Sequence, residues 1–319
     1  MARGLVSRVL LASPRGYCAG VERAVETVER ALSLYGAPVY VRKQIVHNAH
    51  VVRELEERGA VFVEDETEAP PGSILVLSAH GVAPSVHERA AARRLTTIDA
   101  TCPLVTKVHA QARRYAAEGC RVVLIGHAGH EEVVGTMGEA PDAIVLVQSV
   151  EDAEALELPA DAPAAYITQT TLSVDETTEI IDVLKRRFPH IRRPQREDIC
   201  YATSNRQWAV KELLDEVELL LVIGSRNSSN SNRLVEVARA TGIAAHLIDD
   251  ETEIDETWLE GVETVGLTSG ASAPERLVDR VCDWFRARGV REIRPFATVY
   301  EDVVFRLPVE LRRAEMPAA

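Results

Sequence analysis

Three cysteines recur at equivalent places along the chain and give it an internal repeat. Each opens a predicted helix: Cys18 in PRGYCAGVERAVETVERAL, Cys102 in DATCPLVTKVHAQARRYAAEG and Cys200 in DICYATSNRQWAVKELLDEV. They are separated by 84 and 98 residues, which is longer than the period of a stacked repeat protein. Because 319 residues suffice for two or three ordinary domains, the repeat predicts three related α/β lobes.

Polar side chains follow each cysteine at similar distances. His47, His130 and Ser228 come 28 or 29 residues after their cysteine, and His80, Thr170 and Ser272 come 62 to 72 residues after it. Each follows a β-rich run such as SILVLSAHG or LLLVIGSRNSSN, and parallel α/β sheets build their sites at the carboxyl ends of strands. The spacing therefore predicts a pseudo-threefold arrangement, in which three thiolates and two rings of polar groups face one central cavity.

The repeat also suggests where the lobes begin and end. We expect a first lobe at 19–102, a second at 103–196, and a third formed by 1–18 together with 197–285. The remaining residues, 286–319, are expected to form a C-terminal bridging segment and tail, with a closing strand in REIRPFATVY.

Composition narrows the class of protein. A formal net charge of −13 argues against nucleic acid or an anionic membrane as the main partner. No apolar run approaches the ~18 residues of a membrane span, and the N-terminus lacks a signal-peptide pattern. We therefore expect a cytoplasmic protein, whose five cysteines are thiols, metal ligands or nucleophiles rather than a disulfide framework.

Three thiols at helix N-termini suit a soft metal. The free N–H groups of a first helical turn stabilise a thiolate, which makes zinc or an iron–sulfur cluster the candidate ligand. Structural zinc normally uses closely spaced cysteine pairs, which this chain lacks. A [4Fe–4S] cluster held by three cysteines has one iron without a protein ligand, and this indicates catalysis. Cys120 and Cys282 are expected in the core.

The remaining candidates fit an anionic substrate and a proton donor. Short donors on strand-end turns can surround a phosphate or diphosphate: His47, His80, Ser228, Ser229, Asn230 and Ser272. In GHAGHEEVVGT we assign Glu132 as an acid beside the cluster, with Thr170 as a hydroxyl relay. The chain has no phosphate-binding GxxxxGK[ST] loop and no GxGxxG fingerprint, so electrons are expected from a separate protein.

Taken together, several motifs resemble the 4-hydroxy-3-methylbut-2-enyl diphosphate reductase family, from Leu10 to Arg276. They are PRGYCAGVERA, VYVRKQIVHN, SAHGVAPSV, DATCPLVTKVH, IGHAGHEEVVGTMG, TQTTLSVDET, DICYATSNRQ, GSRNSSNSNRL and TSGASAPE. The resemblance implies a three-lobed α/β fold around one [4Fe–4S] cluster per chain. It also implies reductive removal of the substrate's allylic hydroxyl with two electrons and two protons, giving isopentenyl and dimethylallyl diphosphates. The implied electron donor is a redox protein of the ferredoxin or flavodoxin type.

The resemblance also assigns residues. It implies cluster ligation by Cys18, Cys102 and Cys200, and places Glu132 and Thr170 at the substrate hydroxyl. The implied diphosphate site consists of His47, His80, His130, Ser228, Ser229, Asn230 and Ser272. The chain departs from the family pattern at Glu131, where proline is usual, and at Val134, where a second acidic residue is usual.

Two other functions and one further hypothesis follow from the same residues. The alternatives are a non-catalytic metal-cluster sensor of a phosphorylated metabolite and a hydro-lyase without net electron input. Separately, the basic residues Arg15, Lys107 and Arg206 lie close in sequence to the three cysteines, and we hypothesise a positive collar for an acidic electron carrier. The alternative is that they are ordinary salt-bridge partners.

Overall fold

A computed structural model describes residues 6–159 and 163–314. Its first compact unit lies within Met1–Ala19, His47–Val51 and Tyr201–Val304 and contains a parallel five-stranded sheet in the order β10-β9-β11-β1-β12. The strands are β1 (Arg8–Ser13), β9 (Leu219–Ile223), β10 (Ala244–Ile248), β11 (Thr264–Ser269) and β12 (Glu292–Ala297). The fully apolar β9 is buried along its whole length, as expected for a central parallel strand covered on both faces.

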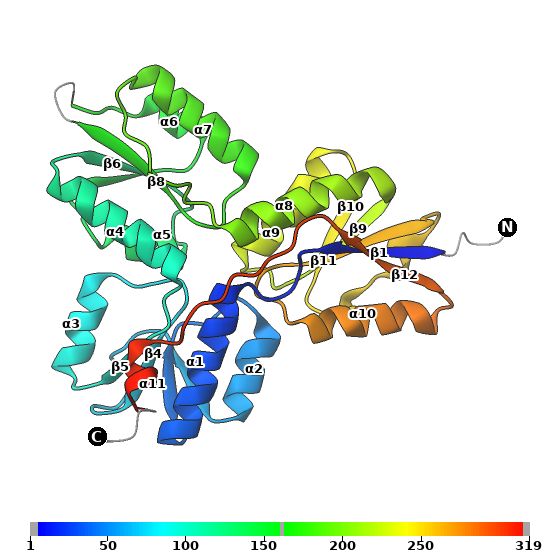
Figure 1. Cartoon of the computed structure of the whole chain (residues 1–319), viewed down its shortest axis with the longest axis horizontal. Coiled ribbons are helices and arrows are strands. Elements are labelled where there is room, and N and C mark those ends of the chain that lie inside the picture. Colours follow the sequence, from blue (N-terminus) through cyan, green and yellow to red (C-terminus); the bar gives the residue numbers. More distant parts are fainter. Residues whose placement is uncertain (1–5, 160–162, 315–319) are drawn as a thin grey trace. The chain divides into compact units, whose positions relative to one another are not determined.

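Helices cover both faces of this sheet (Figure 1). On one face α8 (Tyr201–Leu213) and α9 (Ser229–Ala240) pack in a cluster with Leu10 and Leu220, and on the other α10 (Glu275–Ala287) packs in a cluster with Val9 and Leu221. Alternate residues of one strand thus enter opposite cores, because side chains alternate across a strand. Short 3₁₀ turns lie at Leu214–Glu216, Glu251–Glu253 and Glu256–Leu259.

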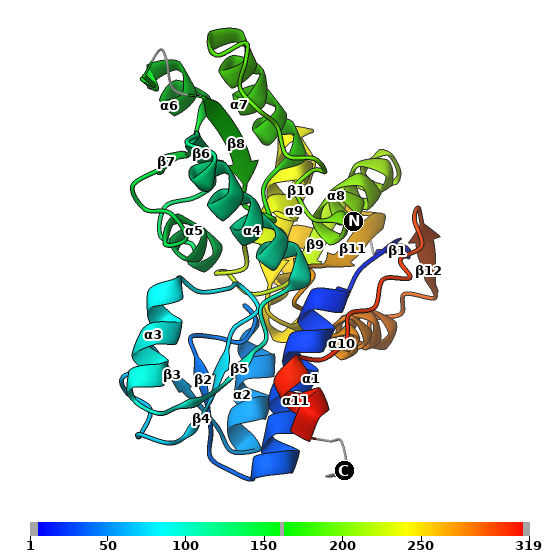
Figure 2. The same ribbon diagram turned by 60° about the vertical axis from the view of Figure 1, so that its left-hand side comes forward.

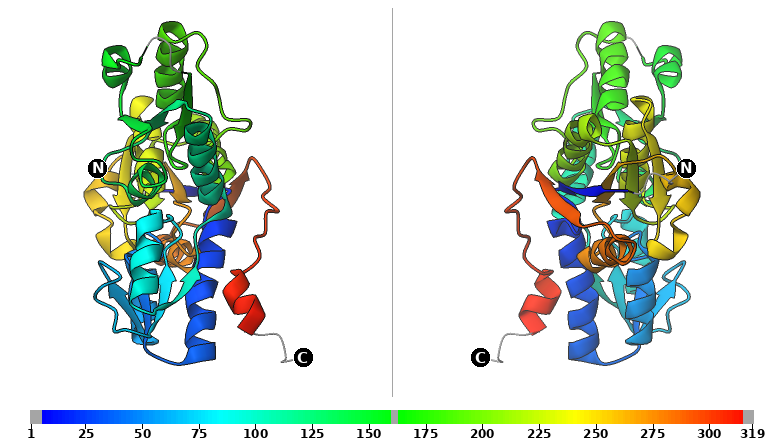
Figure 3. Two further views of the ribbon diagram at one scale, coloured as in Figure 1. Left: turned by 90° about the vertical axis from the view of Figure 1, so that its left-hand side faces the viewer. Right: turned by 90° about the vertical axis from the view of Figure 1, so that its right-hand side faces the viewer.

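The second unit, within Gly20–Val46, Val52–Cys200 and Phe305–Ala319, contains two parallel sheets. The first has the order β3-β2-β4-β5, from β2 (Val39–Arg42), β3 (Ala60–Val63), β4 (Ile74–Leu77) and β5 (Thr96–Asp99). Figure 2 shows α3 (Pro84–Ala92) on one side of it, and α1 (Ala19–Tyr35) with α2 (Ala49–Glu57) on the other. Helix α11 (Val309–Ala314) lies beside α1 (Figure 3), and Arg23 of α1 donates to the carbonyl of Arg306 just before it.

The other sheet of this unit has the order β7-β6-β8, from β6 (Arg121–Ile125), β7 (Ile144–Val147) and β8 (Ala164–Thr168). Helices α4 (Pro103–Ala117) and α5 (Glu131–Met137) pack on the face that carries Leu124. Helices α6 (Val150–Ala155) and α7 (Val174–Arg187) pack on the face that carries Tyr166.

The internal repeat inferred from the cysteines is visible in the strand order. The pairs β2·β4, β6·β8 and β9·β11 are direct neighbours in their sheets. Beside β4 lies β5, which precedes Cys102, and beside β11 lies β1, which precedes Cys18. Beside β8 only the single bridge Ala165 to Arg192 forms, in the segment that precedes Cys200. The expected α/β fold with three lobes is confirmed; the lobe boundaries and the pseudo-threefold arrangement stay predictions.

The C-terminal segment contains the expected closing strand. Strand β12 pairs in parallel with β1 at the edge of the five-stranded sheet. The end of the tail, residues 315–319, lies outside the described residues. Within the part of the chain that the structure describes, no helix has the length and apolar character needed to cross a membrane.

Candidate active site

The three repeated cysteines occupy the same structural position. Cys18 immediately precedes α1, Cys102 is the N-cap residue of α4, and Cys200 immediately precedes α8. Their side chains are partly exposed, whereas Cys120 and Cys282 are buried in hydrophobic clusters, as expected.

A main-chain hydrogen bond repeats at all three cysteines. The N–H of Cys18 donates to the carbonyl of Ala271 (3.2 Å), that of Cys102 to Ala79 (3.0 Å) and that of Cys200 to Thr170 (3.0 Å). Each acceptor lies in the loop after the second strand of its repeat, β11, β4 or β8, at or next to a predicted substrate-binding residue. The fold therefore couples each cysteine to one member of the second polar set by the same contact.

The donor chemistry of these cysteines fits an iron–sulfur cluster. Within residues 6–159 and 163–314 no three His, Cys, Asp or Glu side chains form a group that could hold a metal ion. The thiolates of a cluster, however, bind different irons and need not converge on one atom. A cluster needs accessible thiols that ionise readily, and the three partly exposed cysteines at helix N-termini have both properties. The two buried cysteines are not accessible.

In the first unit, three of the predicted substrate-binding residues are joined by hydrogen bonds, and a fourth, Asn230, bonds to the neighbouring Ala271. Ser228 is the N-cap of α9 and accepts from the N–H and the hydroxyl of Ser231, at 3.3 and 3.0 Å. The hydroxyl of Ser272 donates to the carbonyl of His47 (2.8 Å) and lies 3.5 Å from the Ser228 hydroxyl. Asn230 accepts from the N–H of Ala271 at 2.8 Å, the same residue whose carbonyl binds Cys18.

These contacts leave donors for an anion at the start of α9. Because Ser228 Oγ already accepts two hydrogen bonds, its own hydroxyl proton is available to donate outward. Ser229, the first residue of α9, is partly exposed. The N-terminus of a helix adds a positive dipole end, which favours an anion. This arrangement suits a phosphate-type oxygen.

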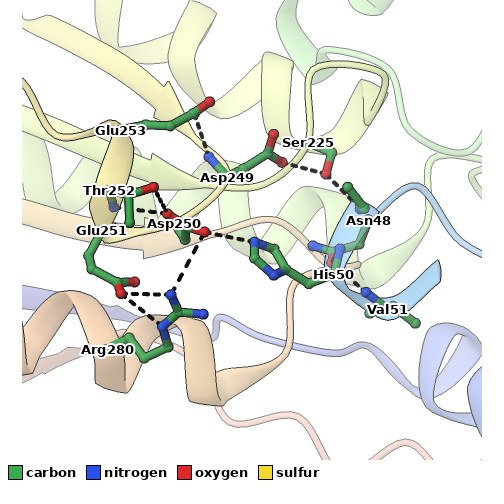
Figure 4. A network of polar contacts seen from close by, with 11 residues as sticks. Asn48, His50, Val51, Ser225, Asp249, Asp250, Glu251, Thr252, Glu253 and Arg280 are labelled. Atoms are coloured by element: carbon green, nitrogen blue, oxygen red, sulfur yellow. Dashed lines mark hydrogen bonds and ion pairs between the residues drawn. The ribbon is translucent and has the colours of Figure 1, made fainter. Parts of the chain in front are cut away.

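The residues that follow His47 are held by loops of the five-stranded sheet (Figure 4). Asn48 caps α2 by accepting from the N–H groups of His50 and Val51. The next residue, Ala49, donates to Ser225 Oγ (3.0 Å), whose hydroxyl donates to Asp249 (2.6 Å).

An ion-pair network adds to the contacts that hold residues 48–51. His50 Nε2 lies 3.0 Å from Asp250 Oδ2, and Arg280 lies 3.8 Å from the same carboxylate and 2.7 Å from Glu251. Burial raises the pKa of Asp250. Hydrogen bonds from Thr252 and the charges of His50 and Arg280 lower the pKa by more than burial raises it, so the net shift is downward. An ionised Asp250 keeps the start of α2 in place.

In the second unit, Glu132 and Thr170 form a buried carboxylate and hydroxyl pair. The Thr170 hydroxyl lies 2.9 Å from both Glu132 oxygens, and the Thr170 N–H donates to Oε2 at 2.9 Å. Both side chains are at most 5% exposed. Since the Thr170 carbonyl accepts from Cys200, the acid is two contacts from a repeated cysteine.

Two histidines complete this group. His130 is the N-cap of α5, and its Nδ1 accepts from the N–H of Glu132 at 3.1 Å. In the neutral ring this places the proton on Nε2, where it can donate to an anion. The ring of His80 meets that of His130 edge to face, with centroids 6.1 Å apart.

Two glycines at strand ends allow the α9 N-terminus to approach the sheet. A Cβ on Gly224, after β9, or on Gly270, after β11, would collide with the side chain of Ser231. Only glycine leaves room for Ser231 to reach Ser228.

Three polar residues of this region escaped the sequence analysis. Asn227 Nδ2 lies 3.3 Å from His47 Nδ1, Thr203 accepts from Asn230 at 3.2 Å, and Ser225 holds Ala49. Two of them, Ser225 and Asn227, lie in the polar run SRNSSN, of which only Ser228, Ser229 and Asn230 were assigned. The length of this run was the sequence signal for the further contacts.

The hypothesis of a basic collar is wrong for Arg206. Its side chain is fully buried, and its guanidinium donates to the carbonyls of Gly16 and Ala202 and pairs with Glu301 at 3.3 Å. Arg15 pairs with Glu275 at 2.6 Å, and Lys107 with Asp198 at 3.0 Å. The alternative, salt-bridge partners, is confirmed, because each cation has a carboxylate within reach.

The two departures in the Glu132 loop lie on its outer side. Val134 is exposed, and Glu131 pairs loosely with Lys43 at 3.8 Å. The buried residues of α5 are Glu132, Val133, Gly135 and Thr136, so both departures lie outside the buried set.

Three parallel sheets, together with a cysteine at the start of each of the helices α1, α4 and α8, define an α/β protein with an internal repeat. The chain belongs to the LytB protein family, whose model matches residues 9–286. It is 62% identical over 307 residues to a protein of Acidothermus cellulolyticus, covering 96% of this chain and 90% of the relative, and 58% identical to one of Streptomyces coelicolor, covering 96% and 91%. Both relatives are named 4-hydroxy-3-methylbut-2-enyl diphosphate reductase.

A solved structure agrees with these relatives. The chain matches the E-1-hydroxy-2-methyl-but-2-enyl-4-diphosphate reductase from Plasmodium falciparum with a TM-score of 0.94 and 39% identity, covering 97% of this chain and 98% of that one. The family recognised from the sequence motifs and the expected enzyme class, an oxidoreductase, are confirmed.

Proposed function

We propose that the chain catalyses the two-electron reductive dehydroxylation of 4-hydroxy-3-methylbut-2-enyl diphosphate. The substrate takes up two electrons and two protons, loses its allylic hydroxyl as water, and gives isopentenyl and dimethylallyl diphosphates. The names of the relatives support the substrate. In the structure, the proposal is carried by Thr170, which joins the buried carboxylate of Glu132 to the main chain of Cys200.

Cys18, Cys102 and Cys200 would hold one [4Fe–4S] cluster, with one iron lacking a protein ligand. When bound, such a cluster supplies electrons and a Lewis-acid position. A separate redox protein of the ferredoxin or flavodoxin type would reduce it. The absence of a nucleotide fingerprint supports a separate donor, and five free cysteines support a reducing, cytoplasmic location.

The chain's own residues bind the substrate and move protons. The diphosphate would be held through charge-assisted hydrogen bonds by His47, His80, His130, Ser228, Ser229, Asn230 and Ser272. Binding of the diphosphate orients the remote hydroxyl, and orientation of this kind lowers the activation free energy by roughly several kcal/mol. Glu132 would hold the proton that leaves with the hydroxyl oxygen, and Thr170 would relay it.

Electron counting distinguishes this proposal from its two alternatives. Anaerobically prepared protein is assayed for iron and sulfide, then for turnover of the allylic diphosphate with a measured amount of reductant. A reductase consumes two electrons per product, a hydro-lyase consumes none, and a sensor forms no product.

Cysteine variants test the ligand assignment in the same preparation. Cys18→Ser, Cys102→Ser and Cys200→Ser are each expected to lose most of the iron and sulfide. Cys120→Ser and Cys282→Ser serve as matched controls and keep both. Stoichiometric zinc without sulfide would overturn the cluster.

A further inference from the structure

The second unit contains a cavity of about 450 Å³ away from the residues assigned to the diphosphate. One wall is β8, through Tyr166 and Thr168. The second is a single face of α7, and the third is the segment 193–199, which leads to Cys200. The α7 residues are spaced as one helical face requires: Val174, Thr177, Thr178, Ile181 and Lys185.

The cavity exists because one strand of the internal repeat is missing. Beside β4 and β11, the strand that precedes the cysteine pairs over four residues, Thr96–Asp99 in one case and 8–11 in the other. Beside β8, pairing stops after Arg192. Seven residues then separate Arg192 from Cys200, and they turn away from β8 instead of completing the sheet.

The departing segment is held firmly from its other side. The Tyr115 hydroxyl donates to the carbonyl of Arg193 at 2.7 Å, and Lys107 donates to those of Arg196 and Glu197. The carboxylate of Asp198 replaces the missing strand by accepting from the N–H of Thr168 (3.2 Å) and from Gln111 (2.7 Å). These contacts fix the segment 193–199 in place, so the cavity is a defined part of the fold.

The rim of the cavity carries three basic side chains and one exposed carboxylate, Glu197, and the α7 side presents Val174 and Ile181 beside two threonines. Lys185, Arg193 and Arg196 are exposed there, while the carboxylate of Asp198 is neutralised by Lys107 at 3.0 Å. Among the described residues, neither Arg193 nor Arg196 has a carboxylate within ion-pair distance. Two unpaired guanidinium groups beside one cavity are unexpected on a chain of net charge −13. Each guanidinium can bind two phosphate oxygens at once through parallel N–H groups.

We propose that this cavity is a second binding site, specific for an organic diphosphate. Arg193, Arg196 and Lys185 would bind the diphosphate, and Val174, Ile181 and Ile199 would contact the organic portion. The volume lies within the range of small-molecule pockets. Because the segment that binds the anion ends at Cys200, whose N–H holds Thr170, occupancy restrains the main chain at the active site and makes this a regulatory site.

The organic portion can come from a prenyl chain or a nucleoside. The test uses geranyl diphosphate, ADP and inorganic pyrophosphate as probes; only the choice of geranyl diphosphate rests on the proposed function. Calorimetry on the complete protein gives the affinity for each. Binding of geranyl diphosphate but not ADP identifies a prenyl ligand, and the reverse identifies a nucleotide. If inorganic pyrophosphate binds as tightly as geranyl diphosphate and ADP do, the organic portion contributes nothing and the proposed site for it is overturned.

Charge-neutralising variants connect the affinity to the cavity. In R193Q/R196Q we expect the better organic probe to bind at least tenfold more weakly, since two charge-assisted contacts are lost. The matched control R53Q/R291Q removes two exposed arginines outside the cavity lining and is expected to bind as the wild type does. An equal loss in both variants would reduce the effect to net charge and refute the site.

Hydrogen exchange separates this proposal from the proposed function. A ligand in the cavity protects amides of 193–199, whereas a ligand in the substrate site protects those of 227–231. Protection confined to 227–231 overturns the second site and leaves the proposed function intact. Protection at 193–199 in a protein that fails to reduce its allylic substrate supports the site and contradicts the function.

Discussion

Replacing Glu132 by glutamine is the sharpest test of the proposed proton donor. Glu132 is 5% exposed and accepts from the N–H and hydroxyl of Thr170, each at 2.9 Å. Glutamine keeps the shape and one acceptor oxygen, and its amide can donate to the Thr170 hydroxyl in place of the second. The structural cost is therefore that of reorganising one hydrogen bond, about 1 kcal/mol.

The catalytic cost is expected to be much larger. Loss of a positioned general acid typically lowers the rate by about 10² to 10⁴, which corresponds to about 3 to 5 kcal/mol in the activation free energy. The fall in kcat thus exceeds what the change in stability can produce. Diphosphate affinity should be unchanged, because Glu132 binds no anion.

The assay is anaerobic turnover of 4-hydroxy-3-methylbut-2-enyl diphosphate with a small chemical reductant, which removes any contribution from docking of a protein donor. Glu131→Gln is the matched control, because it removes the neighbouring carboxylate, whose partner Lys43 is 3.8 Å away at the surface. It is expected to retain nearly full activity. Near-normal kcat in Glu132→Gln, or an equal fall in both variants, would refute the assignment.

Other expectations follow from the same structure. His47→Ala should weaken substrate binding about tenfold with a smaller change in kcat. The control His87→Ala, at an exposed histidine, should bind the substrate normally; equal KM values in the two variants would contradict the role of His47 in diphosphate binding. Gly270→Ala should destabilise the fold by about 1–3 kcal/mol in urea unfolding, because its Cβ meets Ser231, and the loss should shrink in a Ser231→Ala background; an unchanged loss would point to another cause. Burial raises the pKa of Glu139, but hydrogen bonds from His109 and Arg113 outweigh it, so the folded pKa lies below its ordinary value of 4.5. Glu139 therefore stabilises the fold above that pH and loses this contribution as the pH falls through the folded pKa; the stability of Glu139→Gln should decline less on acidification, and parallel curves would exclude the effect.

Local sequence pattern was enough to determine the repeat unit. Each repeated cysteine was expected at the start of a helix, and α1, α4 and α8 begin at or beside them. His47 and Ser272 were expected after strands, and they follow β2 and β11. These features are predictable because helical and strand periodicity, turn residues and helix starts depend on residues near in sequence.

Strand neighbours were decided only by the tertiary structure. By order along the chain, β12 is the counterpart of β5, yet β1 takes the place beside β11 and β12 pairs outside it. A place in a sheet depends on which distant segment covers the available edge, and sequence spacing carries no information about that competition.

The same limit explains the burial of Arg206 and the cavity beside β8. Arg206 lies six residues from Cys200 in a polar helix start, which suggested a surface cation; only the packed fold brings the Gly16 carbonyl and Glu301 to its guanidinium. Likewise, 193–199 resembles an ordinary polar linker in sequence. Its departure from β8 depends on Lys107, Gln111 and Tyr115, which reach it from a helix 78 to 89 residues earlier. The sequence by itself determined the repeated local elements, whereas partners distant in the chain determined which groups are buried, paired or left facing a cavity.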